Sequence, residues 1–384
     1  MNTVILRAPL LTISGYGTHS RQIYRWLRSR DIPVKTQIVP WGVTPWYVNP
    51  DSLGGMIGDI MSRSTSLDVK AERSIQVQLP NEWDTKVATK NIGVSAFVET
   101  DRCNPSWEID CNKMDAIVAP SHFTKKIVSD SVDVRVPFYV IPESYHESSP
   151  DNGFVEKLDF STDFNFLVFG QITGNNPEND RKNLFYTIKW LCETFSNDKN
   201  VGIVVKTNSG RNTSIDRLQT SRLITQLVKE VRKGPFPKVH LLHGALSESE
   251  IMGLYRHPKI KSLVSLTRGE GFGLPLLEAA VSELPVIATD WSGHLDFLNK
   301  GRFSAVEYDL VDIHPSRIDN SIFIPGAKWA MPREKEAKRR LKKFRTSSQL
   351  PKQWAVDLAG KLKDTFSQKS INLIYDECLM GFIE

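Results

Sequence analysis

Short apolar runs alternate with amphipathic stretches along most of this chain, which is the pattern of parallel strands covered by helices. In the first half, an opening strand is predicted at residues 3–7 and a helix at about 18–30. The further strands predicted from apolar runs are 34–39, 74–79, 93–98, 116–119 and 138–141. This series predicts a first α/β domain over residues 1–150.

A polar stretch at about residues 142–163 interrupts the pattern, and we interpret it as a linker. The pattern restarts at 164–169 with a continuous apolar run, which is typical of a parallel strand buried on both faces. Helical spacing at 353–382 predicts C-terminal helices over residues 351–384. The elements predicted in between are helices at 183–195, 214–231 and 247–255, and strands at 201–205, 239–242, 262–266 and 286–288. They predict a second α/β domain over residues 160–350.

The composition fits a globular protein of this size. A chain of 384 residues suits two domains, and 40% hydrophobic with 24% charged residues is ordinary for globular proteins. No run reaches the roughly 18 apolar residues that would span a membrane, and no signal peptide is expected. The four cysteines lack metal-ligand spacing, so we expect no metal site and reduced thiols in a cytoplasmic protein. The net charge of +5 permits an anionic partner without requiring one.

The most informative segment is Ser265-Leu-Thr-Arg-Gly-Glu-Gly-Phe-Gly-Leu-Pro-Leu-Leu-Glu278. It follows an apolar strand with a glycine-bearing loop and a proline suited to the first turn of a helix. Such a helix N-terminus attracts an anion, and glycines let the backbone approach it closely. Glu270 and Glu278 would repel a bare phosphate, but they can accept hydrogen bonds from sugar hydroxyls that flank a diphosphate. The segment therefore predicts a nucleotide-sugar site.

This segment resembles the E-x7-E signature of the retaining GT-B glycosyltransferases of the glycogen-synthase and sucrose-synthase type, called family 4. The resemblance implies two Rossmann-like domains with parallel sheets facing a central cleft, and C-terminal helices 351–384 that return to the first domain. It also implies a metal-independent enzyme that moves a sugar from a donor such as a UDP- or GDP-sugar to a hydroxyl group. The donor would contact Phe272, Gly273 and Leu274, together with Glu270 and Glu278.

Cations for the donor diphosphate are expected in the loop after the strand at 164–169. Lys182 matches the family's Lys-Asn at the start of the next helix, whereas Gln171 stands where the family has a first cation. Arg181 and Lys206 are the other candidates, because positioned cations can offset the charge of a departing nucleotide diphosphate.

The resemblance places residues 243–246, from His243 to Leu246, near the nucleotide base. Arg268 either contacts the donor or is an exposed loop residue.

The acceptor side is expected in the first domain. Gly15 and Gly17 follow the first strand, where the family's backbone approaches the diphosphate. Glu99 and Asp101 are expected at the end of a strand, near the place where many family members have a histidine. Asp101 is interpreted as a catalytic residue that orients a hydroxyl, or alternatively as a cap of a helix near Ser106. His19, beside the glycines, is a further candidate.

The chemistry and the acceptor leave alternatives open. Glu270 and Lys182 are the main catalytic candidates, but no carboxylate is a sure nucleophile. We therefore favour front-side attack in which the departing phosphate helps to deprotonate the acceptor. The preferred acceptor is a glycan or small molecule. A basic run at 333–345 supports an alternative, a glycosyltransferase that acts on hydroxylated or hydroxymethylated pyrimidines in DNA. A further alternative is a non-catalytic sugar-nucleotide binding protein. The sequence carries no signal for the oligomeric state.

Overall fold

The computed structural model describes residues 3–66 and 68–383 of the chain. Its residues form two compact units. The first unit contains residues 1–144, 320–324 and 366–384, and the second contains residues 145–319 and 325–365. Both units are α/β, as the alternating sequence pattern predicts. The C-terminal helical region is divided between the units, because the boundary falls at residue 366.

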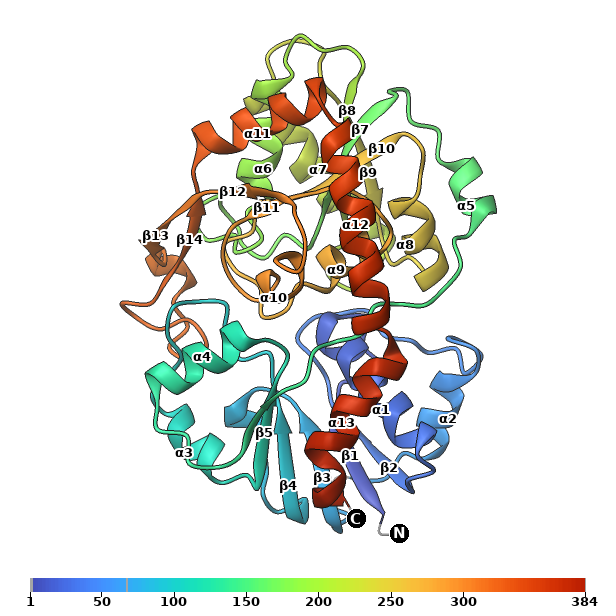
Figure 1. Cartoon of the computed structure of the whole chain (residues 1–384), viewed down its shortest axis with the longest axis vertical. Coiled ribbons are helices and arrows are strands. Elements are labelled where there is room, and N and C mark those ends of the chain that lie inside the picture. The colour runs from blue at the N-terminus through green and yellow to red at the C-terminus, as the bar shows by residue number, and fades with distance from the viewer. Residues whose placement is uncertain (1–2, 67, 384) are drawn as a thin grey trace. The chain divides into compact units, whose positions relative to one another are not determined.

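The first unit is built on a six-stranded parallel sheet with the order β2-β1-β3-β4-β5-β6. Figure 1 shows β1, β3, β4 and β5 side by side in this unit. The strands are β1 (Val4–Ala8), β2 (Val34–Ile38), β3 (Ala71–Val77), β4 (Ala88–Val94), β5 (Ala116–Ala119) and β6 (Phe138–Val140). The chain reverses its direction of travel across the sheet at β1, since β2 and β3 pair with opposite edges of that strand.

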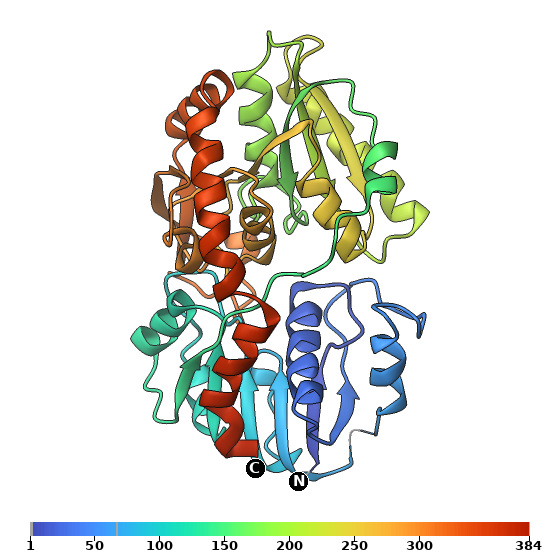
Figure 2. The ribbon, with the colours of Figure 1, turned by 45° about the vertical axis from the view of Figure 1, so that its right-hand side comes forward.

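Four helices connect these strands, and a fifth comes from the end of the chain. They are α1 (Gly15–Ser29), α2 (Met56–Ser62), α3 (Trp107–Asn112), α4 (His122–Ser131) and α13 (Gln368–Ile383). Ser14 caps α1 by accepting a hydrogen bond from the Gly17 N–H. Figure 2 shows α13 beside α1, where Trp26 and Tyr375 stack at 4.7 Å between ring centroids.

The second unit repeats this architecture with a parallel sheet of order β12-β11-β10-β7-β8-β9. Its strands are β7 (Phe164–Phe169), β8 (Val201–Thr207), β9 (Lys238–His243), β10 (Ile260–Ser265), β11 (Val286–Thr289) and β12 (Ser304–Val306). β7 is buried along its middle, as its continuous apolar sequence predicts. The switch in direction lies between β7 and β10, because β8 and β10 pair with opposite edges of β7.

The helices of the second unit cover both faces of the sheet. They are α5 (Asn152–Lys157), α6 (Leu184–Thr194), α7 (Ser214–Val231), α8 (Glu248–Tyr255), α9 (Leu274–Val281), α10 (Leu295–Leu298), α11 (Glu334–Thr346) and α12 (Gln349–Thr365). α12 packs on α9, and α11 packs on α6. An antiparallel hairpin of β13 (Tyr308–Asp312) and β14 (Lys328–Pro332) adds a pair of strands that the sequence pattern did not predict.

One of the predicted strands extends too far. The strand expected at 93–98 is β4, which ends at Val94. The apolar run continues past this end because Phe97 and Val98 are buried in a loop, where they pack with Trp83 and Trp107. The stretch 142–163, which is predicted as a linker, includes the boundary between the two units at residues 144 and 145, and it also contains the short helix α5, whose cap is the Asp151 carboxylate.

Candidate functional site

The carboxyl edge of the second sheet carries most of the residues singled out for donor binding. All six strands are parallel, so the loops that follow them emerge along the same edge. In open α/β sheets, ligands bind at this edge where the strand order switches. The switch lies between β7 and β10, which makes the loops 170–183 and 266–273 the candidate site.

These two loops meet through an ion pair. Lys182 Nζ donates to both carboxylate oxygens of Glu270, at 2.7 and 2.6 Å, although 88 positions separate the residues in sequence. Arg181 donates from Nη1 to the Gly269 carbonyl at 2.6 Å and lies 3.7 Å from the Glu270 carboxylate. Glu270 is only 6% exposed. Burial alone would raise its pKa, but the charges of Lys182 and Arg181 outweigh burial and lower the pKa of this carboxyl.

The backbone around Glu270 is held by the loop that follows β11. The Glu270 N–H donates to Ser292 Oγ at 2.9 Å, and the Glu270 carbonyl accepts from the Gly293 N–H at 2.9 Å. A Cβ atom on Gly293 would lie 2.1 Å from the Gly271 carbonyl, so the two loops are in direct contact. Ser292 has a φ of 91°, an unfavourable value for a serine. The sequence analysis did not reveal the support that Ser292 gives to Glu270.

Helix α9 begins directly after this loop. Gly273 is its N-cap, with a φ of 97°, and accepts a hydrogen bond from the Leu276 N–H at 2.9 Å. A side chain at Gly273 would crowd His294, whose Cβ lies 3.0 Å from the position of an added Cβ. The predicted residues Phe272 and Leu274 flank this glycine, and Phe272 is buried against Phe297. The N-terminal end of α9 therefore lies on the same loop as Glu270, where its dipole favours a negative group.

Lys206 lies at the same edge, at the end of β8. It is 4% exposed, and its Nζ donates to the Gly244 carbonyl in the loop after β9. Burial lowers the pKa of Lys206 to about 8. His243 ends β9, and burial together with the Lys206 charge lowers its pKa. Leu246 follows in the same loop and is half-buried. Lys206 and the predicted base-binding segment are thus brought together.

Glu278 contacts a different set of residues. It lies on the second turn of α9 and is buried. His146 Nδ1 contacts the Glu278 carboxylate, and His146 Nε2 lies 3.3 Å from Glu248 on α8. Burial and then the Glu278 charge raise the pKa of the Tyr255 hydroxyl well above its usual value. Glu270 is held by cations, whereas Glu278 is enclosed by His146 and Tyr255.

Gly15 and Gly17 lie in the first turn of α1 and not in a loop before it. A Cβ atom on Gly17 would lie 2.1 Å from the Thr12 carbonyl oxygen, so tight packing requires glycine there. Gly15 has open space at the corresponding position. The structure therefore gives a steric reason for a glycine at position 17 and none at position 15.

The other first-unit candidates occupy positions that differ from the expectation. Glu99 and Asp101 do not end a strand but lie in the loop after β4, where Asp101 is 3.6 Å from Arg102. His19 is buried inside the unit, where its Nε2 lies 3.1 Å from the Tyr375 hydroxyl. Desolvation lowers the pKa of His19 to about 4.

Arg268 is not an exposed loop residue, so that interpretation of it is wrong, while a contact with the donor stays a prediction. It is 2% exposed, and its guanidinium lies 5.1 Å from the Trp329 ring on β14. Its Nη2 donates to the Pro177 carbonyl at 3.0 Å. Arg268 therefore ties the hairpin to the loop that leads to Lys182.

The basic run at 333–345 forms α11 and its N-cap, and many of its cations are paired within the unit. Arg333 binds Asp309 and Glu307, and Arg345 binds Asp198. The remaining pairs are Lys338 with Glu193 and Glu334, and Arg339 and Arg340 with Glu336. A phosphate backbone would have to compete with these carboxylates, so the pairing favours a structural role for the run.

Within residues 3–66 and 68–383, no cluster of three or more His, Cys, Asp or Glu side chains is arranged to hold a metal ion. Over the same residues, no helix combines the length and the apolar character needed to cross a bilayer.

Sequence comparison identifies one family. Residues 225–309 match the model of a family described as glycosyl transferases, group 1. The match includes α9 and Glu270, and it confirms the predicted enzyme class, a glycosyltransferase. No protein of curated function matches the sequence significantly.

Structural comparison extends over the whole chain. A sucrose-phosphate synthase from Thermosynechococcus elongatus matches with a TM-score of 0.66 and 12% identity, covering 100% of this chain and 99% of that chain. An α,α-trehalose 6-phosphate synthase from Burkholderia multivorans matches with a TM-score of 0.60, 8% identity and coverage of 99% and 98%. An E. coli trehalose-6-phosphate structure bound with UDP-2-fluoro glucose matches with a TM-score of 0.59, 9% identity and coverage of 99% and 98%. These matches confirm the predicted GT-B fold, with two parallel six-stranded sheets.

Proposed function

We propose that this chain is a retaining, family-4-like glycosyltransferase that takes its sugar from a nucleotide-diphosphate sugar bound at the carboxyl edge of the second sheet. The observation that supports this most is the Lys182–Glu270 ion pair at the switch between β7 and β10. This pair supports the proposal because a cation suited to a phosphate and a carboxylate suited to sugar hydroxyls lie within one hydrogen bond of each other.

Donor binding would separate this pair and give each partner a new contact. Lys182, with Arg181 beside it, would donate to the diphosphate, and Glu270 would accept from hydroxyls of the transferred sugar. The α9 N-terminus and Lys206 would add positive potential as the nucleotide diphosphate leaves. The His243–Leu246 loop would face the base. Glu278 would bind the ribose after its contact with His146 is broken.

The stereochemistry and the metal independence are part of the proposal. Glu270 is occupied by two cations, which suits a binding role better than a nucleophilic one. We therefore propose front-side attack with retention, in which the leaving phosphate accepts the acceptor proton. Lys182, Arg181 and Lys206 would offset the charge of the leaving group without a metal ion.

UDP is the proposed nucleotide, since one structural neighbour is bound with UDP-2-fluoro glucose. The proposed acceptor is a hydroxyl of a glycan or small molecule, with Asp101, Glu99 and His19 as acceptor-side candidates. The DNA acceptor is disfavoured by the ion pairs of α11. The test is to measure the DNA-binding constant of the protein and of a Lys342→Ala/Lys343→Ala variant at several salt concentrations. If these lysines contact DNA phosphates, the variant's binding constant should depend less steeply on salt.

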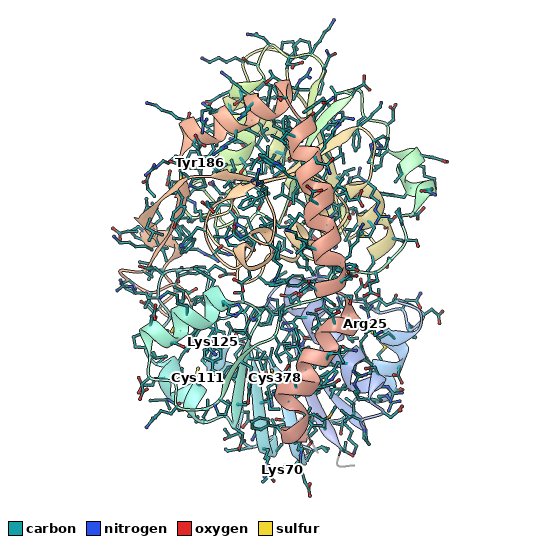
Figure 3. All side chains as sticks on the ribbon, viewed as in Figure 1. Arg25, Lys70, Cys111, Lys125, Tyr186 and Cys378 are labelled. Carbon is teal, nitrogen blue, oxygen red and sulfur yellow. The ribbon has the colours of Figure 1, made fainter. Side chains whose placement is uncertain are left out.

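A reducing, cytoplasmic location is also proposed. The cysteines are free thiols, and Cys103, Cys111 and Cys192 are buried. Figure 3 labels Cys111 and Cys378, which come from α3 and α13. Burial raises the pKa of the Cys111 thiol to about 12 and that of Cys103 to about 11, so these thiols are poor nucleophiles.

The test is calorimetric titration of UDP-, GDP- and ADP-sugars in the presence of EDTA, followed by NMR of the hydrolysis or transfer product. We expect one UDP-sugar to bind and to be cleaved with the anomeric configuration retained. Binding without any turnover over a broad acceptor panel would instead support the sugar-nucleotide binding protein. A requirement for added metal, or an inverted product, would contradict the proposed chemistry.

A further inference from the structure

A cavity of about 590 Å³ lies at the amino edge of the second sheet, at the opposite ends of the strands from the proposed donor site. It is formed by the end of α8, the segments that lead into β10 and β11, and one side of α12. All of its lining residues belong to the second unit. The charged ones are Arg256, Lys261, Glu283, Lys352 and Lys363.

The cavity is strongly positive. Four cations and one carboxylate line it, so its formal charge is 4 − 1 = +3. Lys363 and Glu283 form an ion pair at 2.8 Å, which neutralises both. The other three cations, Arg256, Lys261 and Lys352, form no ion pair with any residue that the structure describes. This differs from α11, where many of the basic side chains have carboxylate partners.

The charge of one cavity lysine acts on another. Burial and then the charge of Lys352 lower the pKa of Lys261, while the charge of Asp163 acts in the opposite direction. The Lys261 ammonium donates to the Pro258 carbonyl, which holds its charge at the cavity wall. Like charges kept close together in a concave site gain free energy when an anion binds between them.

Helix dipoles reduce this positive potential without cancelling it. α8 ends at Tyr255 and α9 ends at Val281, so two negative helix ends lie near the cavity. Each contributes roughly half a negative charge. The remaining charge of about +2 matches an anion with two or more negative charges, such as a phosphate group.

The rest of the lining limits the size and character of the ligand. Ile260, Leu284, Pro285 and the half-exposed Val356 provide an apolar wall beside the cations. Pockets of 300–1,000 Å³ are typical of small-molecule sites. We propose that this cavity binds the phosphate group of a small phosphorylated molecule, separately from the donor. β10 has six residues, so the two sites lie roughly 20 Å apart along the strands.

The test is calorimetric titration of the full-length protein with inorganic pyrophosphate at constant ionic strength, with and without saturating UDP. A parallel titration with glucose 1-phosphate shows whether inorganic pyrophosphate or a phosphate ester is the better ligand. We expect pyrophosphate to bind in the presence of UDP. Arg256→Ala/Lys352→Ala should weaken this binding about tenfold or more, because it removes two charge-assisted contacts.

The matched control is Lys342→Ala/Lys343→Ala on α11, which removes the same charge from an exposed helix surface. It should change the affinity for pyrophosphate by less than about twofold relative to wild type, since distant surface charges are screened. Both cavity residues in the test variant are exposed, and an unchanged melting temperature confirms folding. Full competition by UDP, equal losses in the two variants, or no binding of either phosphate would overturn the proposal. Failure of UDP to bind would contradict the donor site alone, because the variants still test the cavity.

Discussion

Removal of the Lys182 side chain is the perturbation that tests the geometry of the donor site most broadly. The Lys182 side chain is 21% exposed and that of Glu270 is 8% exposed, so the pair is largely shielded from water. Breaking a buried pair by removing one partner costs about 3–5 kcal/mol. Here Arg181 still lies 3.7 Å from the Glu270 carboxylate. We therefore expect Lys182→Ala to lower the free energy of unfolding by about 1–3 kcal/mol.

The pH dependence of this loss has a defined sign. The pKa of Glu270 is lowered in the folded protein from its usual 4.5, so the ion pair stabilises the fold above that pH. The contribution disappears as the pH falls through the lowered pKa and the carboxyl is protonated. The difference between wild type and Lys182→Ala should therefore be largest at pH 7 and should shrink below pH 4. Urea denaturation at both pH values measures it.

The same variant should bind the donor more weakly. Loss of one charge-assisted contact to the diphosphate is expected to reduce the affinity for a UDP-sugar about 10- to 100-fold. Lys199→Ala is the control, since Lys199 is exposed and lies outside the candidate site. The reasoning is refuted if Lys182→Ala binds UDP-sugar as tightly as the control, or if its stability loss is independent of pH.

Three further predictions concern single positions. Because the pKa of Lys206 is lowered to about 8, the affinity for UDP should fall roughly tenfold between pH 7 and 9 as the lysine loses its charge. Lys206→Met should abolish this dependence on pH, and the same dependence in both proteins would exclude Lys206 from the site. Gly17→Ala should destabilise the protein by about 1–3 kcal/mol in chemical denaturation, because its Cβ would meet the Thr12 carbonyl, whereas Gly15→Ala should be neutral or slightly stabilising. Arg268→Ala should lower the melting temperature by several degrees, since it removes about 1–3 kcal/mol of buried contacts, and an unchanged value would show that its packing is dispensable.

The hydrophobic pattern of the sequence was sufficient to predict most strands of the second sheet. β7 and α7 have the predicted bounds. The uninterrupted apolar run of β7 fits a parallel strand that is buried on both faces, and Thr213 marks the start of α7 as a helix cap. The β13–β14 hairpin escaped prediction because its strands are separated by residues 313–327, too far apart for a turn signal. The burial of Arg268 was not predicted for the same reason: the Trp329 ring beside it comes from that hairpin.

The position of a candidate residue could be predicted where it follows from the ends of parallel strands. It could not be predicted where it depends on packing between segments that are distant in sequence. The motif and the strand order together indicate that Lys182 and Glu270 meet at the switch between strands. The burial of His19 depends on Tyr375, which is 356 positions away in sequence, and no local pattern reports that contact. The pairing of Glu278 with His146 is equally non-local, because it joins the second turn of α9 to the segment before α5.

The most direct test of the central claim is a crystal structure of the protein with a non-hydrolysable UDP-sugar. The account predicts that the diphosphate lies against the N-terminus of α9 at residues 272–274, that Lys182 has moved from Glu270 to a phosphate oxygen, and that Glu270 accepts a hydrogen bond from a sugar hydroxyl. A diphosphate bound elsewhere, with the Lys182–Glu270 pair intact, would contradict it.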